Sequence, residues 1–425
     1  LRVGDCMSRQ LARTVITSMT GNLFEWYDFA LFGYFAPIIG KLFFPSFDPI
    51  SQLLSAYGAF AAGYLARPLG GLFFGYIGDR HGRKKALVLT ILFMAIPTVL
   101  IGVLPTYEHI GGAASAVLII LRMLQGVSMG GNYAGSITFT TEHSRKKYRG
   151  LIGSFTVTSC LMGLMLGSAT AALFSSILTD AQMETWGWRL PFLAGIFICV
   201  VGYYLRRRVA ESPVYEQAEQ SGNLSQTPVR DVFKKHCGSL LSLVLVVMLH
   251  DLSFYILFVY MTTHLTEFLH LSKSMAFTIN TINMVFVSLI TVGSAWLSDL
   301  YGRKIVMGTA AVLFIVGTIP LMTVVNQSDQ TLYIFLAQTL MAIGVGGYFG
   351  PLPALMVETF PTAVRNSAVS LTTNISGPLF GGTAPQVVII FITLTGSNLV
   401  PAFYLTAGAI VSLVALIRLK AVYND

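Results

Sequence analysis

Two carboxylates lie three residues apart in an otherwise apolar stretch near the start of the chain. Residues 21–29 read GNLFEWYDF and contain Glu25 and Asp28. Helical spacing would place both side chains on one face, one turn apart. Because hydrocarbon is a costly place for a carboxylate, such a residue pairs with a cation, faces water, or takes up and releases a proton in a mechanism. Glu25 and Asp28 are therefore the first candidates for chemistry.

The composition is typical of an integral membrane protein. The chain has 425 residues, of which 54% are hydrophobic and 11% are charged, and its mean hydropathy is +0.69. A soluble protein would carry more charge. The chain begins at Leu1 without a signal-peptide pattern, so we expect that the native start was trimmed or not included and that the first helix directs insertion. The four cysteines lack metal-type spacing, and we expect no disulfide and no metal.

Twelve apolar segments are long enough to cross about 30 Å of hydrocarbon. The expected helices span residues 14–39, 52–77, 86–104, 113–141, 149–177, 190–207, 238–266, 274–297, 305–324, 331–357, 366–394 and 399–419. A polar connector divides them six and six. The predicted fold is therefore an all-α membrane protein with twelve transmembrane helices in two pseudo-symmetric six-helix bundles.

Five regions follow from this division. They are an N-terminal cytoplasmic tail (1–13), a six-helix bundle (14–207), a cytoplasmic linker (208–236), a second six-helix bundle (237–419) and a C-terminal tail (420–425). We expect the linker to be partly helical and solvated at the cytoplasmic surface. A regulatory docking site is the alternative interpretation.

The lysines and arginines predict the orientation in the membrane. If both termini are cytoplasmic, 22 of the 27 fall in inside segments, while Lys41, Arg189 and Lys273 fall outside and Arg67 and Arg122 lie within helices. Cytoplasmic loops are enriched in lysine and arginine, so this distribution favours cytoplasmic termini. It also explains the net charge of +8 without a nucleic-acid partner.

Several polar residues fall at a similar depth. Counting a rise of about 1.5 Å per residue from the cytoplasmic helix ends, we place five of them in a layer about 7 Å thick near the bilayer midplane: Glu25, Asp28, Arg67, Asn132 and Asp251. Arg122 lies farther out, but its long side chain can reach towards Asp28. Positions 122, 125, 129, 132 and 136 share one face of their helix.

The leading hypothesis for proton coupling is an ion pair between Asp28 and Arg122. Burial disfavours a charged carboxylate and a nearby arginine favours it, so forming and breaking the pair could switch protonation. The alternative is a permanent structural ion pair. Glu25 could pair with Arg67 in the same way, or carry the proton itself.

The second half of the chain adds further candidates. Asp251 is a carboxylate at middle depth and is the last of the proton-coupling candidates, whereas the adjacent His250 is more readily explained as a hydrogen-bonding residue. The candidate substrate contacts are Arg67, Asn132, Tyr133, Tyr255 and Asn374. Asn374, like Asn280 and Asn283, could equally join helices by hydrogen bonds.

Two loop signatures recur in the two halves. An aspartate followed by Gly-Arg-Lys occurs twice at positions 220 residues apart, at Asp79 with Gly82-Arg83-Lys84 and at Asp299 with Gly302-Arg303-Lys304. A glutamate with an arginine seven residues later occurs twice at positions 216 residues apart, as Glu142 with Arg149 and as Glu358 with Arg365. Such repeats indicate an internally duplicated transporter.

These signatures resemble the major facilitator superfamily over all twelve helices. Within it, the chain resembles the metabolite:proton symporter family, which includes transporters of proline and betaine, citrate, 2-oxoglutarate and shikimate. The matching stretches are Gly21-Asn22-x-x-Glu25-Trp26-Tyr27-Asp28-Phe29, Arg67-Pro68-x-Gly70-Gly71, Gln125-Gly126-x-Ser128-x-Gly130-Gly131 and Trp186-Gly187-Trp188-Arg189-x-Pro191-Phe192. The chain departs from its relatives at Asn132, where they commonly carry glutamate.

The resemblance implies that the loop residues form a cytoplasmic latch that breaks on inward opening. Asp79 would accept hydrogen bonds from the N-terminus of the eleventh helix and pair with Arg149. Asp299 with Arg365 would act in the same way in the second half. The gating candidates are Asp79, Arg83, Arg149, Asp299, Arg303 and Arg365. Ordinary capped turns are the alternative.

The expected function is proton-coupled import (symport) of a small polar metabolite by alternating access. Paired arginines at positions 67 and 122 would suit a zwitterionic amino acid or betaine, and unpaired ones an organic acid; Asn132 in place of glutamate favours carboxylated substrates. A proton-independent uniporter or exchanger is the alternative. We expect no catalytic residue and no cofactor besides the proton gradient, because no nucleotide-binding loop or catalytic triad is evident. The expected setting is a monomer in the lipid bilayer of a bacterial inner membrane.

Overall fold

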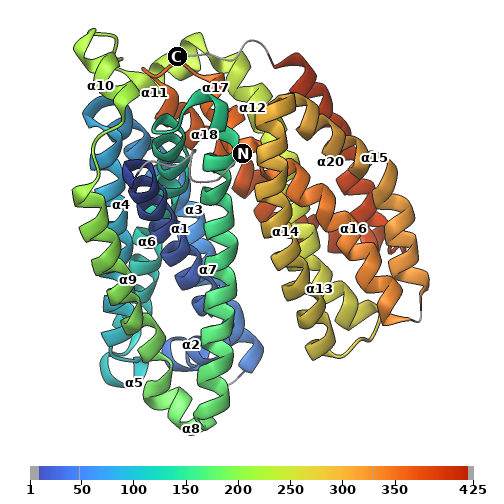
Figure 1. Cartoon of the computed structure of the whole chain (residues 1–425). Helices are drawn as coiled ribbons and strands as arrows, with labels where there is room; N and C mark the ends of the chain where they lie inside the picture. Colours follow the sequence, from blue (N-terminus) through green and yellow to red (C-terminus); the bar gives the residue numbers. More distant parts are fainter. Residues whose placement is uncertain (1–8, 47, 329, 420–425) are drawn as a thin grey trace. The chain divides into compact units, whose positions relative to one another are not determined.

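The computed structural model describes residues 9–46, 48–328 and 330–419, and helices dominate them (Figure 1). The tail expected over 420–425 and the first eight residues of the tail expected over 1–13 lie outside this part of the chain. The six helices of the first half are α1 (Arg9–Tyr34) with its short continuation α2 (Ala36–Phe43), α3 (Pro49–His81), α4 (Arg83–Val103), α6 (Gly112–Glu142), α7 (Arg149–Ile177) and α9 (Arg189–Arg208).

The second half begins after two short connector helices, α10 (Pro213–Gln220) and α11 (Pro228–Lys235). Its long helices include several that change helical type or bend within one expected span. They are α12 (Cys237–Phe254) with η4 (Tyr255–Tyr260), α13 (Met261–Thr263) and η5 (His264–Phe268); α14 (Lys273–Tyr301); α15 (Arg303–Gln327); α16 (Thr331–Phe349) with α17 (Leu352–Thr359); α18 (Arg365–Ser376) with η6 (Gly377–Gly382) and α19 (Ala384–Thr395); and α20 (Val400–Arg418). Short helices in the connections of the first half are α5 (Tyr107–Ile110), η2 (Lys146–Tyr148), α8 (Asp180–Gln182) and η3 (Met183–Gly187).

Each of the twelve expected spans is occupied by helix. Ten helical stretches in the described part of the chain are long and apolar enough to cross a membrane. Two further long helices, α1 and α3, are more polar. For α1 the reason is the pair of carboxylates, Glu25 and Asp28, which stand in its middle.

The chain divides into two compact units that do not coincide with the two halves of the sequence. The first comprises the residues up to His143 together with Ser159–Val229 and Thr362–Leu371. The second comprises Ser144–Thr158, Arg230–Pro361 and the residues from Thr372 onwards. Each unit thus contains the beginning of one helix from the opposite half of the sequence, and hydrogen bonds described below explain why.

Glycines bring the helices of the first unit into close contact. A Cβ atom added to Gly126 of α6 would lie 1.7 Å from the carbonyl oxygen of Gly63 on α3. One added to Gly163 of α7 would lie 2.4 Å from the carbonyl oxygen of Leu23 on α1. Both distances are far below van der Waals contact, so the backbones of α3 and α6, and of α1 and α7, cross where only glycine fits.

A buried tryptophan packs at the end of this unit that is opposite to the loop signatures. Trp188 is fully buried and packs edge-on against Phe43, with ring centroids 5.6 Å apart. The next residue, Arg189, donates hydrogen bonds to the carbonyl oxygens of Gly102 (3.1 Å) and Leu104 (2.7 Å) at the end of α4. Arg189 therefore satisfies backbone carbonyl groups that a helix end leaves open.

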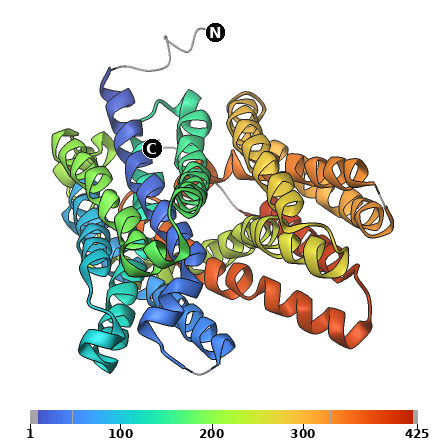
Figure 2. The same cartoon turned by 90° about the horizontal axis from the view of Figure 1, so that it is seen from below.

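In the second unit, α14, α15 and α16 pack against one another, and α20 packs against α12 and α15. Figure 2 shows these yellow-to-red helices from below. The turns between paired helices repeat across the chain: Gly82 joins α3 to α4 with a φ of +103°, and Gly302 joins α14 to α15 with a φ of +98°. Residues with a side chain rarely adopt such angles, so both copies of the signature require glycine there.

Candidate functional site

Asp28 and Arg122 form a buried ion pair in the first unit. The Nη1 atom of Arg122 lies 2.7 Å from Oδ2 of Asp28, and both side chains are at most 5% exposed. The other carboxylate oxygen accepts hydrogen bonds from Thr98 of α4 (3.0 Å) and Gln125 of α6 (3.1 Å). Three side chains from two helices, α4 and α6, therefore supply donors to one carboxylate, as its burial requires.

The guanidinium of Arg122 is held on several sides as well. It donates to Oε1 of Gln125 (2.6 Å) and lies 3.9 Å above the ring of Phe32, which favours a cation. A recess beside the pair is lined by residues that include Phe60, Tyr64 and Met129, and its accessible volume is about 10 Å³. That is room for about one water molecule.

Glu25, one turn before Asp28, belongs to a second network. Its Oε2 atom accepts a hydrogen bond from the amide nitrogen of Asn132 (2.9 Å), which also donates to Asn22 (3.0 Å). The amide oxygen of Asn132 accepts from Nη2 of Arg206 (2.8 Å). Arg206 on α9 also donates to Thr90 (3.1 Å) and to the carbonyl oxygen of Leu87, both on α4.

Arg206 has contacts that the sequence did not predict. The run Arg206-Arg207-Arg208 was interpreted only as part of the cytoplasmic charge that sets orientation, and Arg206 is 1% exposed. Arg207 and Arg208 are exposed and lie over the rings of Tyr203 and Tyr204. Helical geometry directs one of three consecutive arginine side chains inwards. The only sequence pattern that could have identified Arg206 as that residue is its position on the apolar face of α9.

The other candidates of the first unit lie near these networks. Arg67 of α3 is 6% exposed, lies 4.7 Å above the ring of Tyr64 and acts electrostatically on Glu25. Tyr133 is half-buried on α6, beside Asn132. The structure therefore brings Glu25, Asp28, Arg122 and Asn132 into two adjoining networks around α1.

The second unit holds a separate polar cluster. Oδ2 of Asp251 accepts a hydrogen bond from Ser376 (2.5 Å), and its Oδ1 atom lies 3.1 Å from Nδ1 of His250. The ring of His250 packs 4.0 Å from that of Phe349. Tyr255 is half-buried near Gly381, where an added Cβ would lie 2.7 Å from its ring. Asn374 is buried in the same unit.

The substrate contacts expected from the sequence are thus divided between the units. Arg67, Asn132 and Tyr133 belong to the first, and Tyr255 and Asn374 to the second. Their convergence on one substrate stays a prediction. No three His, Cys, Asp or Glu side chains are grouped for a metal ion in residues 9–46, 48–328 and 330–419.

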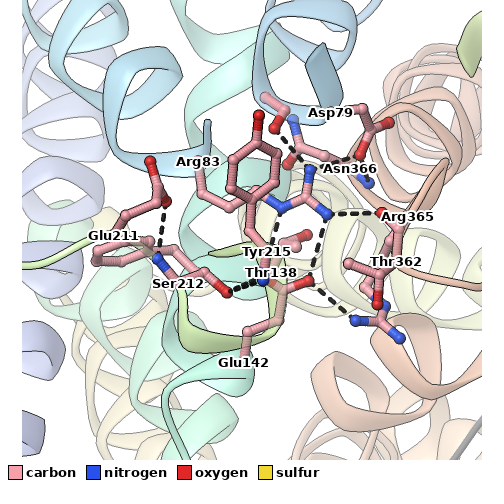
Figure 3. Close-up of polar contacts among 12 residues, drawn as sticks. Asp79, Arg83, Thr138, Glu142, Glu211, Ser212, Tyr215, Thr362, Arg365 and Asn366 are labelled. Atoms are coloured by element: carbon pink, nitrogen blue, oxygen red, sulfur yellow. Dashed lines mark hydrogen bonds and ion pairs between the residues drawn. The ribbon is translucent and has the colours of Figure 1, made fainter. Parts of the chain in front are cut away.

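The first loop signature forms a fully buried cluster, shown in Figure 3. Arg83 pairs with Asp79 at 2.6 Å and with Glu142 at 3.3 Å, and it donates to the carbonyl oxygen of Thr362 (2.8 Å). Arg365 pairs with Glu142 at 2.9 Å. One arginine from each repeated signature therefore contacts the same glutamate.

Asp79 binds the start of α18. Its two oxygens accept hydrogen bonds from the backbone N–H groups of Asn366 (3.0 Å) and Ser367 (2.8 Å). This is the contact with the eleventh helix that the resemblance implied, and it suits a carboxylate because a helix N-terminus carries partial positive charge and free N–H groups. It also explains why Thr362–Leu371 belongs to the first unit.

The connector begins inside this cluster, which the sequence did not predict. Ser212 is fully buried, donates to Glu142 (2.5 Å) and caps α10 by accepting from the N–H of Tyr215. The ring of Tyr215 lies 5.2 Å from the guanidinium of Arg83. The connector was expected to be solvated at the cytoplasmic surface, but its side chains at Ser212 and Tyr215 are buried. Ser-Pro is a recognisable helix start, but no sequence pattern indicated its docking.

Glu211 caps the start of α4 from the connector. Its carboxylate lies 3.1 Å from the backbone nitrogen of Lys84 and 2.8 Å from that of Ser212. Burial raises the pKa of Glu211 above its usual range, although these N–H groups and Arg83 act in the opposite direction. Burial likewise raises the pKa of Tyr215. Burying either side chain in its charged form therefore costs free energy.

The second loop signature repeats the arrangement in the second unit. Asp299 accepts hydrogen bonds from the N–H groups of Gly150 (2.9 Å) and Leu151 (2.8 Å) at the start of α7. Arg303 pairs with Asp299 at 2.5 Å and with Glu358 at 3.3 Å. The pairings of Asp79 with Arg149 and of Asp299 with Arg365 stay predictions.

Comparison with known proteins adds the family. Residues 13–227 match the family model described as sugar (and other) transporter, and residues 243–423 match that of the major facilitator superfamily. The chain is 33% identical to the glycine betaine/proline/ectoine/pipecolic acid transporter of Dickeya dadantii (strain 3937), over 98% of this chain and 84% of the relative. It is 32% identical to the proline/betaine transporter of Escherichia coli (strain K12), with the same coverage.

The fold is also that of a solved transporter. A structure of the proton:xylose symporter XylE bound to 6-bromo-6-deoxy-D-glucose superimposes with a TM-score of 0.77 at 18% identity, over 96% of this chain and 94% of that one. The expected arrangement of two six-helix bundles is thereby confirmed. The chain belongs to the major facilitator superfamily, as a multi-pass membrane protein and secondary transporter of small solutes rather than an enzyme.

Proposed function

We propose that the protein imports a small zwitterionic solute, of the kind represented by proline and betaine, together with protons. The observation that carries this proposal is the pair of buried carboxylates in α1, Glu25 and Asp28, each at 1% exposure. Both stand in the middle of an otherwise apolar helix, where a permanently charged group is costly. Asp28 lines a small recess with room for about one water molecule, and Glu25 lies one helical turn away.

The charges favour a zwitterion as substrate. Asp28 compensates Arg122, and Asn132 contributes hydrogen-bonding groups without a charge. The other charged side chains of the first unit's networks are Arg67, Arg206 and Glu25, and their formal charges sum to +1. An excess cation suits a substrate carboxylate. Proline and betaine, the substrates named for the Escherichia coli relative, carry a carboxylate together with a positively charged nitrogen.

Transport would follow alternating access around the midplane residues, with protons moving inward alongside the solute. The clusters around Arg83 and Arg303 would act as latches, because each joins an aspartate to the N-terminus of another long helix. We place the protein in the inner membrane of a bacterium with both termini cytoplasmic, functioning as a monomer in the lipid bilayer, with the proton gradient as its energy source and without a cofactor.

The experiment has two stages. Thermal stabilisation of the purified protein is first measured with proline, glycine betaine, citrate, 2-oxoglutarate and shikimate, because a bound ligand raises the melting temperature. Uptake of the stabilising solute into proteoliposomes is then measured with and without an imposed pH gradient. We expect a zwitterion to stabilise and the gradient to drive accumulation. Equal uptake with a collapsed gradient would favour a uniporter or exchanger.

A further inference from the structure

The two carboxylates of α1 are held in different ways. Both oxygens of Asp28 accept hydrogen bonds, including one from a guanidinium. Glu25 is equally buried, at 1% exposure, but only its Oε2 atom accepts a bond. Its Oε1 atom has no hydrogen-bond partner in the described chain. A buried anionic oxygen without a donor is costly, and a proton placed on it removes that cost.

The orientation of the Asn132 amide is set by Arg206. A guanidinium can only donate hydrogen bonds, and Nη2 of Arg206 lies 2.8 Å from Oδ1 of Asn132. The oxygen of this amide must therefore face Arg206, which leaves its nitrogen to donate to Glu25 and to Asn22. Without Arg206, the amide of Asn132 could turn and present its oxygen to Glu25. That oxygen would repel the ionised carboxylate of Glu25, but it would accept a hydrogen bond from the protonated carboxyl group.

The surrounding helices make room for this arginine. A Cβ atom added to Gly21 of α1 would lie 1.8 Å from Nη2 of Arg206, so a side chain at this position would displace the guanidinium from its place beside α1. Thr90 and the carbonyl oxygen of Leu87 hold the other amino group from α4. Four helices, α1, α4, α6 and α9, thus fix the position of one side chain.

We propose that Glu25 carries the coupling proton and that Arg206, acting through Asn132, is its positioning residue. This inference rests on the proposed proton coupling and decides which acid of α1 performs it. Asp28 keeps Arg122 as its ion-pair partner. The proton binds the open oxygen of Glu25 and later leaves the same atom for water, while the amide of Asn132 keeps the carboxyl group in place.

Charges from each neighbouring helix act on Glu25. Arg67 on α3 and Arg206 on α9 favour its anion, Asp28 on α1 itself opposes it, and Cys160 on α7 is the titratable group on the remaining side. Removing Arg206 takes away one of two favourable charges and releases the amide. The protonated form of Glu25 therefore gains, and proton release needs a higher pH.

The test compares Arg206→Gln with Arg207→Gln in proteoliposomes, using radiolabelled proline as the probe. Arg207 is the matched control because it is an exposed arginine on the same helix. We expect Arg206→Gln to shift the pH midpoint of gradient-driven uptake upward by about one unit, the size that loss of a nearby charge produces. Arg207→Gln should keep the wild-type midpoint, and Arg206→Lys, which retains the charge, should lie between the two.

A second readout does not depend on transport. Difference infrared titration follows the protonated carboxyl group directly, and the band lost in Glu25→Gln identifies Glu25. That band should titrate at a higher pH in Arg206→Gln. If this variant does not fold, Asn132→Ala tests the same link, since it removes the donor to Glu25 and should shift the band in the same direction.

The outcomes separate this inference from the proposed function. Glu25→Gln should abolish gradient-driven accumulation while exchange of labelled for unlabelled proline continues. If wild-type uptake depends on the gradient but Arg206→Gln and Arg207→Gln share one midpoint, the role of Arg206 is wrong. If Glu25→Gln still accumulates proline, the proton is carried elsewhere. If the wild type itself ignores the gradient, the proposed coupling fails and this inference fails with it.

Discussion

Arg83 neutralises two buried carboxylates with one guanidinium. Its partners Asp79 and Glu142 are, like Arg83 itself, fully buried, and two carbonyl oxygens, of Gly78 and Thr362, accept its remaining bonds. A buried ion pair adds little net stability when complete, but removing one partner leaves the others uncompensated. Arg83 therefore matters because its loss would leave the buried carboxylates without their shared compensating charge.

We predict that Arg83→Ala lowers the free energy of unfolding by about 3 kcal/mol or more, because Asp79 and Glu142 would stay buried without their shared cation. Thermal melting in detergent measures the loss. Lys85→Ala, at an exposed position two residues away, is the control and should change stability by less than about 0.5 kcal/mol. Equal melting temperatures for the two variants would show that the cluster does not depend on this arginine.

Sequence reasoning found some of these residues and missed others for identifiable reasons. Asp28 and Arg122 were paired because charges in apolar helices must find partners, and helical rise placed them within reach. Arg206 was missed because it stands in a basic run, and the positive-inside rule explains such a run without any inward-facing member. Glu211 and Ser212 were missed because the docking of a polar connector depends on tertiary contacts.

At the scale of elements, the connector between the halves is tied to α4 and to the Arg83 cluster. Glu211 accepts the N–H of Lys84 near the start of α4, and Tyr215, two residues into α10, is 2% exposed. Helix α10 also begins with a serine cap followed by proline, so its local start is well defined. The short segment 209–215 is therefore a structural part of the first unit.

We predict that this docking weakens as pH rises. Burial raises the pKa of Glu211 in the folded protein, so the folded state binds its proton more tightly than the unfolded chain does. The stabilisation from this protonated carboxyl group is at its full size below the ordinary glutamate pKa of about 4.3. It is lost as the pH rises through the raised pKa of Glu211 in the folded protein. Hydrogen exchange at residues 209–216, corrected for intrinsic rates, should show falling protection over that range. In Glu211→Gln this pH dependence should disappear; protection that rises with pH in the wild type would contradict the assignment.

The crossing of α3 and α6 provides a second prediction for elements. Gly126→Ala would place a methyl group against the backbone of Gly63, which cannot move aside as a side chain would. We expect a loss of about 1–3 kcal/mol, the usual cost of overpacking. Gly58→Ala in α3 has open space around its Cβ and should be neutral or slightly stabilising. If Gly126→Ala melts no lower than Gly58→Ala, the close crossing is wrong.

Helix boundaries were largely predictable, whereas internal irregularities were not. The segment expected over 149–177 coincides with α7, because its apolar run ends at clear polar residues. The turns at Gly82 and Gly302 follow from glycine before a basic pair. By contrast, the π-helical segments η4 and η6 carry no hydrophobic period of their own, and they adjoin the cluster of Asp251, Tyr255 and Ser376.

At the scale of the whole molecule, the duplicated sequence produces two units with matching clusters. In each, an aspartate at the end of one helix binds the first N–H groups of a helix from the other half of the sequence. The connector predicted a division into two six-helix bundles, but it could not predict this exchange. The reason is physical: the bond from Ser367 to Asp79 joins residues 288 positions apart, a separation at which no local pattern operates.

Proton movement driven by a solute gradient is the most direct measure of proton-coupled import. Proline is added outside proteoliposomes that contain a pH-sensitive dye, with no pH gradient imposed. We predict that the interior acidifies with wild-type protein and with Arg207→Gln, and that the signal is lost in Glu25→Gln. Entry of radiolabelled proline without any dye response beyond that of protein-free vesicles would contradict proton-coupled import.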